Sequence, residues 1–292
     1  MKYQGNNYTT ANLGKNFTFG VMWHVCPARK LDVTNKDDVI LAVENAYRDM
    51  MPRTITGLGL SALDKINSRS IKGQDDEQKK ALLKQKESLK EKKQTLLDEL
   101  RMKLAENIIE NVFKAKGGIG EFNDTIHKAL CNAFIQDFVT KASALNEEID
   151  KFNSDYALSV DKVISKVDVE KITYGKAQKI VNMTMKQLYC FYNAPTYKNS
   201  VFQYCHIPID SVILEFFHLS SKYVWSNLKT YDEYLSVQKQ CKRQWKDKVN
   251  AAGLRTTDDM RHIFFAEFVI WDAGTERKGK KKLNIDSIEI SP

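Results

Sequence analysis

The feature that most constrains the fold is a long run of charged residues and leucines between Gln74 and Lys116. Lysines and acids alternate there around spaced leucines, which is typical of a helix with one narrow apolar face. Because its first part has so few apolar positions, we expect residues 74–103 to protrude as a charged helical arm. Such an arm can touch DNA or a partner helix, although mixed charge of this kind is also ordinary solvated surface.

The composition points to a mainly α fold. Only 5 prolines and 13 glycines occur in 292 residues, and 42% of the chain is hydrophobic, enough for a real core. The formal net charge of +8 favours an anionic partner such as nucleic acid, because many basic side chains create a field that attracts phosphate.

Neither a metal nor a membrane is indicated by the sequence. The five cysteines are scattered without a paired motif, which is typical of a reducing compartment. His127 and Cys131 have helical ligand spacing, but one pair is only half a metal site, so we interpret both as core residues. No apolar run reaches the length of a membrane span, and no signal peptide is apparent. We therefore expect a soluble, cytoplasmic monomer without a cofactor.

The spacing of apolar residues and the positions of proline and glycine divide the chain into segments. The apolar spacing predicts helices over residues 36–51, ended by Pro52, and over residues 121–145, followed by a polar connection. The glycines at 117–120 indicate a hinge. The resulting division is an N-terminal helical region with the arm (1–116), a catalytic region (117–275) and a flexible basic tail (276–292).

The stretch from Asp161 to Phe217 carries the most specific pattern. After a helical segment, Gly175 is expected to form a tight turn in which a phosphate can approach free helical N–H groups. The next helix then has two faces. The apolar face consists of Ala177, Ile180, Val181, Thr184, Leu188 and Phe191, and the other face carries Lys176, Lys179 and Lys186.

A third helix is predicted after the sequence Ile207-Pro208-Ile209-Asp210. Pro208 fixes the approach of the chain, and Asp210 stands where a carboxylate accepts hydrogen bonds from the first N–H groups of a helix. Capping alone explains an isolated aspartate in this position. The order of glycine, lysines and aspartate in one stretch raises the alternative that Asp210 is also catalytic.

In this order the stretch resembles the helix-hairpin-helix DNA glycosylases. It is most similar to the archaeal 8-oxoguanine glycosylase group and to related antiphage DNA glycosylases, over about sixty residues. The resemblance implies a catalytic lysine at Lys179, a second lysine at Lys186 and a catalytic aspartate at Asp210. The hairpin has a single glycine, Gly175, where the family has two, and Lys176 competes with Lys179 for the reactive position.

Two further regions would complete such an enzyme. A basic helix over about 232–251 offers phosphate contacts, and aromatic residues offer platforms for an extruded base. The predicted DNA-binding residues are Gly175, Lys176, Lys186, Lys242, Arg243 and Lys246, and the predicted base pocket contains Tyr192, Tyr197, Tyr204 and Trp225.

The resemblance implies that a modified base is excised from double-stranded DNA. Glucosylated hydroxymethylcytosine, an antiphage substrate, ranks ahead of 8-oxoguanine. Two alternatives remain open: a helical DNA-binding protein without chemistry, in which Asp210 is only a cap, and a scaffold that binds protein through the charged arm.

Overall fold

The computed structural model describes residues 2–3, 31–54, 75–114, 122–155, 166–191, 201–251, 262–275, 285–287 and 289–290. Over these residues the protein is mainly α-helical, as the composition predicted. A parallel pair of two-residue strands accompanies the helices. None of the described helices combines the length and the apolar character needed to cross a membrane.

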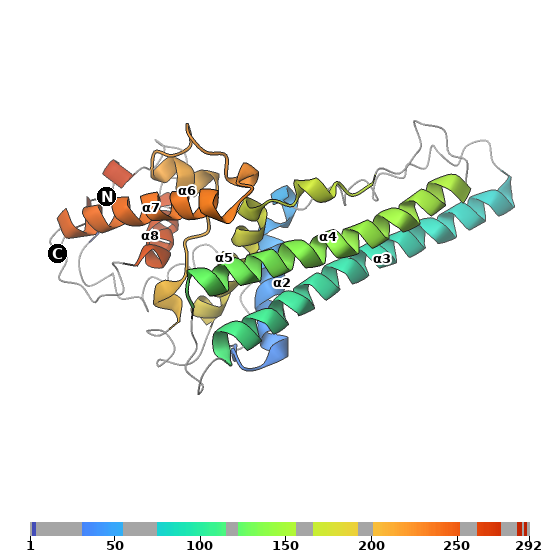
Figure 1. Ribbon diagram of the computed structural model, residues 1–292, viewed down its shortest axis with the longest axis horizontal. Coiled ribbons are helices and arrows are strands. Elements are labelled where there is room, and N and C mark those ends of the chain that lie inside the picture. Colours follow the sequence, from blue (N-terminus) through green and yellow to red (C-terminus); the bar gives the residue numbers. More distant parts are fainter. Residues whose placement is uncertain are drawn as a thin grey trace.

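The charged arm is a hairpin of two long helices, α3 (Asp76–Ile108) and α4 (Asp124–Asp155), which lie side by side and extend away from the rest of the molecule (Figure 1). Asp75 caps α3 by accepting a hydrogen bond from the Gln78 N–H at 2.8 Å. A π-helical turn, Ile109–Phe113, continues α3. The predicted protrusion of residues 74–103 is therefore confirmed.

Two predicted helix ends were wrong. The helix expected to stop at residue 145 continues to Asp155, because Leu145, Ile149 and Phe152 extend its buried stripe along the arm. Helix α2 (Lys36–Thr54) likewise runs past Pro52. A proline removes one N–H bond, and near the end of a helix this loss does not prevent the last residues from staying helical.

Helix α5 (Tyr174–Phe191) is the centre of the body. It packs against α2, α4 and α7 (Tyr231–Ala251), so its residues are buried nearly all round. The shorter elements around it are η7 (Val169–Lys171), η8 (Phe202–Tyr204), α6 (Ser211–Phe216), η9 (Trp225–Asn227) and α8 (Ile263–Thr275).

The two chain ends meet at the side of the body opposite the arm (Figure 1). Strand β1 (Lys2–Tyr3) pairs in parallel with β2 (Glu289–Ile290). Before β2, the short helix η11 (Ile285–Ser287) buries Ile285, and Asp286 accepts a hydrogen bond from His218 at 2.8 Å. Within the predicted tail, residues 285–287 and 289–290 therefore contact other described parts of the chain.

Several predicted features lie outside the described residues. These are the glycine hinge at 117–120, which is also the predicted domain boundary, and residues 161–165 of the segment before Gly175. The described part of that segment contains η7, a single 3-10 turn, in which Asp168 accepts a hydrogen bond from the Glu170 N–H at 3.1 Å.

Candidate active site

Helix α5 carries polar side chains into the core. Gln178, Asn182 and Lys186 are each at most 1% exposed, although burying a polar group without a partner costs free energy. Their spacing of four residues places them along one face of the helix, where Lys179 adjoins them. Each of these buried polar side chains has a partner within the fold.

Gln178 holds the segment that leads to Asp210. Its amide nitrogen donates to the carbonyls of Gly175 and Ile209, both at 2.8 Å. Its amide oxygen accepts from the Ile209 N–H at 3.2 Å. Because both polar groups of Ile209 are bound to one buried side chain, the backbone just before Asp210 has a fixed position relative to α5.

Asp210 begins α6 as predicted, with its two carboxylate oxygens in different roles. Oδ1 accepts from the Ile213 N–H at 2.9 Å, which is the N-cap hydrogen bond. Oδ2 faces the Lys179 ammonium, whose Nζ lies 3.2 Å away. Capping therefore leaves one oxygen directed at the lysine.

The Lys179 and Asp210 side chains are mostly buried but reachable, at 17% and 13% exposure. The Lys179 ammonium also lies over the ring of Trp225, 5.0 Å from its centroid, where a cation is attracted by the ring face. The structure thus brings together an amine, a carboxylate and an aromatic ring that the sequence assigned to one site.

Gly175 does not have the predicted role. It lies in the first turn of α5 rather than in a turn between helices, and its N–H already donates to the Leu228 carbonyl at 2.9 Å. A Cβ at this position would lie 1.8 Å from the Trp225 carbonyl oxygen. The glycine is needed so that the η9 backbone can approach α5, and its N–H has no capacity left for a phosphate.

Lys186 was wrongly predicted to bind DNA. Its side chain is 1% exposed and forms an ion pair with Glu267 of α8, itself 3% exposed, at 2.6 Å. Burial raises the pKa of Glu267, and the positive charge of Lys186 counteracts this. The sequence pattern predicted that the Lys186 ammonium lies on a face that binds DNA. In the structure this ammonium lies in the core, where Glu267 neutralises its charge.

Lys176 remains near the surface. Its Nζ donates to the Lys171 carbonyl at 2.6 Å, and partial burial lowers its pKa. Within the described residues Lys176 forms no hydrogen bond or ion pair with Asp210, so the geometry favours Lys179 over Lys176 as the reactive lysine.

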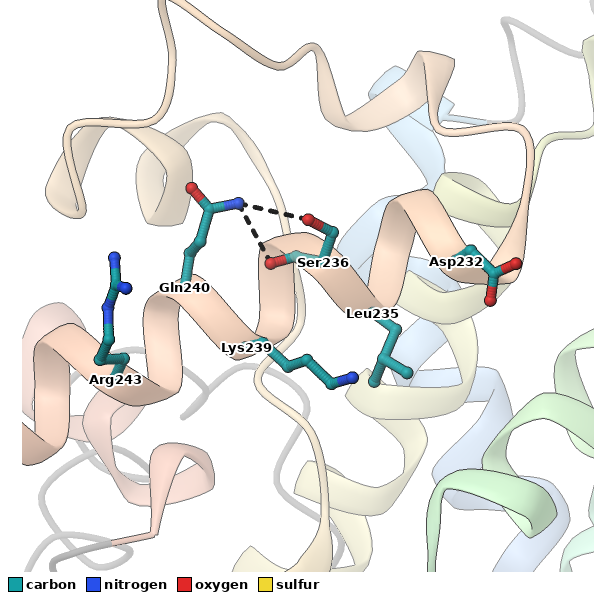
Figure 2. A pocket seen from close by; sticks show the side chains of 6 residues that line it. All are labelled: Asp232, Leu235, Ser236, Lys239, Gln240 and Arg243. Atoms are coloured by element: carbon teal, nitrogen blue, oxygen red, sulfur yellow. Dashed lines mark hydrogen bonds between the residues drawn. The ribbon is translucent and has the colours of Figure 1, made fainter.

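The basic residues predicted on α7 are exposed, as DNA contacts require. Lys239, Lys242, Arg243 and Lys246 form no ion pair within the described chain. Figure 2 shows Lys239 and Arg243 on a shallow surface of α7, together with Asp232, Ser236 and Gln240. The face is suited to phosphate contacts, with Asp232 at one end as the opposing charge.

Two of the four residues predicted to form the base pocket, Trp225 and Tyr204, lie among the described residues. Trp225 lies beside Lys179, whereas Tyr204, which is 54% exposed, lies near His262 with ring centroids 6.3 Å apart. Tyr192 and Tyr197 lie outside the described residues. Only Trp225 of the described pair is in contact with Lys179.

Sequence reasoning missed a hydrogen-bonded network behind the site. Asn182 donates to Gln178 Oε1 and to the Tyr234 hydroxyl, both at 2.9 Å, and its oxygen contacts His127 Nε2 at 3.0 Å. His127 is therefore the donor to Asn182. Burial lowers the pKa of His127 well below its usual value, so the ring is neutral.

The network ends at a histidine and a carboxylate. Tyr234 also accepts from Gln238 at 2.9 Å, so its own proton goes to His206 Nδ1, also at 2.9 Å. His206 Nε2–H then donates to Asp124 at 2.8 Å, and this hydrogen bond lowers the pKa of Asp124. His206 lies 82 positions from Asp124, so no local pattern indicates the pair.

Comparisons with models of protein families, with curated proteins and with solved structures found no match to this chain. Within the described residues, no group of three histidine, cysteine or acidic side chains is placed to hold a metal ion.

Proposed function

We propose that this protein is a DNA glycosylase, which flips a modified base out of the duplex and cuts its N-glycosidic bond to leave an abasic site. The observation that carries the proposal is the pair of Lys179 and Asp210, 3.2 Å apart and partly accessible. An amine and a carboxylate at this distance are the groups needed to attack the sugar and to stabilise its positive charge.

Asp210 has the geometry of a preorganised carboxylate. The N-cap hydrogen bond fixes Oδ1, and Gln178 fixes the preceding residue, so Oδ2 can face the sugar without reorganisation. In the transition state of glycosidic cleavage, positive charge develops on the sugar ring. A fixed negative oxygen beside it lowers the barrier more than it strengthens ground-state binding.

Two chemical routes use the same pair. In the first, Lys179 passes a proton to Asp210, its nitrogen attacks the sugar C1′, and the C1′–N bond breaks as the base leaves with the bonding electrons and takes that proton from Asp210. The ring-opened Schiff base can then lead to strand scission. In the second, water attacks C1′ and passes a proton to Asp210, the base leaves with the bonding electrons and that proton, and Lys179 only positions the DNA. Trapping with borohydride distinguishes the routes, because only the first has a reducible imine.

DNA reaches the site through basic side chains at the surface. Lys242, Arg243 and Lys246 on α7 supply phosphate contacts, with Lys176 as a further cation near the start of α5. The partner is double-stranded DNA, because a base held in the stack must be flipped out before its glycosidic bond can be reached.

The substrate is proposed to be a modified base, with glucosylated hydroxymethylcytosine ranked ahead of 8-oxoguanine. A sugar-bearing base needs a wide pocket with aromatic platforms and polar donors, and Trp225 beside Lys179 is the described aromatic candidate. Two DNAs of one sequence, each with one of these bases, test the ranking. Abasic sites in the oxidised DNA alone would exclude the antiphage function.

A second candidate function is a helical DNA-binding protein without chemistry. The observation in its favour is the N-cap hydrogen bond of Asp210, which gives this residue a structural role. The two functions differ in the effect of Asp210→Asn. Asparagine caps a helix as well as aspartate does, so the fold and DNA binding should survive while charge-dependent base release is lost.

A further inference from the structure

A cavity of about 440 Å³ lies where the first turn of α4, the η8 segment and α7 meet. Asp124, His206, Tyr204, Lys239 and Lys242 are among its lining residues, while Lys179 and Asp210 are not. Lys239 also lines the shallow surface of Figure 2, so the cavity adjoins the basic face of α7. Its volume is in the range of sites for small ligands.

The network behind the cavity determines which hydrogen-bonding groups face a ligand. Because His206 Nε2–H donates to Oδ1 of Asp124, that carboxylate stays ionised and offers its remaining oxygen as an acceptor. The Asp124 side chain is 58% exposed. A ligand group that donates hydrogen bonds is therefore the natural partner of Asp124.

Gln238 is a further polar residue of the cavity lining. The residue is 4% exposed and lines the cavity. Its nitrogen is occupied by the Ile207 carbonyl and the Tyr234 hydroxyl, while its oxygen is buried without a donor in the described chain. A buried acceptor without a donor is uncommon in a native protein.

Other residues that line the cavity contribute positive charge and an aromatic ring. Lys239 and Lys242 are exposed cations, suited to a phosphate. Tyr204 is 54% exposed, and an exposed tyrosine ring is a platform on which a base can stack. A free phosphate would be repelled by Asp124, and an apolar ligand would leave the second carboxylate oxygen of Asp124 without a donor.

We propose that this cavity binds one unpaired nucleotide of a DNA strand whose base carries an amino group. The phosphate lies at Lys239 and Lys242, the base stacks on Tyr204, and its amino group donates to Asp124. The site is separate from the Lys179 and Asp210 pair, and it rests on the proposed function only because DNA must reach α7.

The test measures the affinity of the intact protein for three duplexes: one with a single bulged cytosine, one with a bulged uracil and one fully paired. Cytosine and uracil differ at the position where an amino group is replaced by a carbonyl oxygen. The bulged cytosine should bind about tenfold more tightly than the paired duplex, and more tightly than the bulged uracil. Equal affinity for all three would overturn the proposal.

Variants assign the preference to the cavity. Tyr204→Ala should reduce the ratio of bulged to paired affinity to about one, and Asp124→Ala should remove the preference for cytosine over uracil. Lys246→Ala is the matched control, because it lowers affinity for all three duplexes by the same factor. If Tyr204→Ala and Asp124→Ala leave both ratios unchanged, the nucleotide does not bind in this cavity.

The proposal and the glycosylase function fail separately. Base release from modified DNA without a bulge preference would refute the cavity site alone. A bulge preference without base release would refute the glycosylase alone, and absence of DNA binding at low salt would refute both.

Discussion

The ammonium of Lys186 and the carboxylate of Glu267 lie 2.6 Å apart, with 1% and 3% of their side chains exposed, and join the central helix α5 to α8. A buried charge that keeps its partner is tolerated, but one that loses its partner is expensive. Lys186 follows Lys179 by seven residues along α5. The ion pair therefore holds the C-terminal half of the helix that carries the candidate catalytic lysine against α8.

Removing one member of this pair should destabilise the fold. We expect Lys186→Met to lower the free energy of unfolding by about 3 to 5 kcal/mol, because Glu267 is left without its countercharge. The double variant Lys186→Met/Glu267→Leu should recover part of this loss. Urea unfolding measures the free energy of unfolding of the single and the double variant. Lys171→Met, at an exposed lysine, is the control and should change this free energy by less than about 0.5 kcal/mol. A double variant no more stable than the single one would contradict this account.

Gly175→Ala tests the close approach of η9 to α5. The added Cβ would lie 1.8 Å from the Trp225 carbonyl oxygen, so the backbone must shift. We expect a loss of about 1 to 3 kcal/mol, the usual range for overpacking. Thermal unfolding measures the loss, with Lys176→Ala as the neighbouring control. Unchanged stability would mean that the two segments can separate freely.

Sequence patterns were sufficient for features set by neighbouring residues. Asp210 was placed as a helix cap because proline, aspartate and a following apolar run are adjacent in sequence. The arm was recognised because the charge and leucine pattern of α3 needs no distant information. Both features depend on interactions within a few residues, which the sequence displays directly.

Features set by distant residues were not predictable in this way. The face carrying Lys186 gave no sign that Glu267, 81 positions later, would neutralise it in the core. Gly175 was assigned a turn because glycine allows one, while its actual constraint is the Trp225 carbonyl. The contact between His206 and Asp124 likewise depends on the tertiary fold alone.

The buried His127 predicts how stability depends on pH. Its pKa is well below 6.5 in the folded protein because of burial, so the unfolded chain binds a proton near pH 6.5 that the folded chain does not. Stability therefore falls as pH falls below about 6.5, by up to about 1.4 kcal/mol per pH unit for this group. His127→Gln should make this dependence shallower in chemical unfolding between pH 7 and pH 5. An unchanged slope would contradict a neutral His127.

The basic face of α7 predicts the salt dependence of DNA binding. Arg243→Ala combined with Lys246→Ala removes two phosphate contacts, so the slope of log affinity against log salt should fall in magnitude by about 1.8. Lys80→Ala with Lys84→Ala is the control of equal charge on the exposed arm. Equal changes in the two double variants would show that α7 is not a specific DNA face.

The most direct test of the proposed function is base release by the wild type and by Asp210→Asn. Both proteins are incubated with DNA containing glucosylated hydroxymethylcytosine and, separately, 8-oxoguanine, and abasic sites are revealed with alkali. We predict release by the wild type and at least about 100-fold slower release by Asp210→Asn, with DNA affinity nearly unchanged, because asparagine keeps the cap and removes the charge. Equal release by both proteins would show that Asp210 is a cap without a catalytic role, and no release by the wild type from either DNA would contradict the proposed activity on these bases.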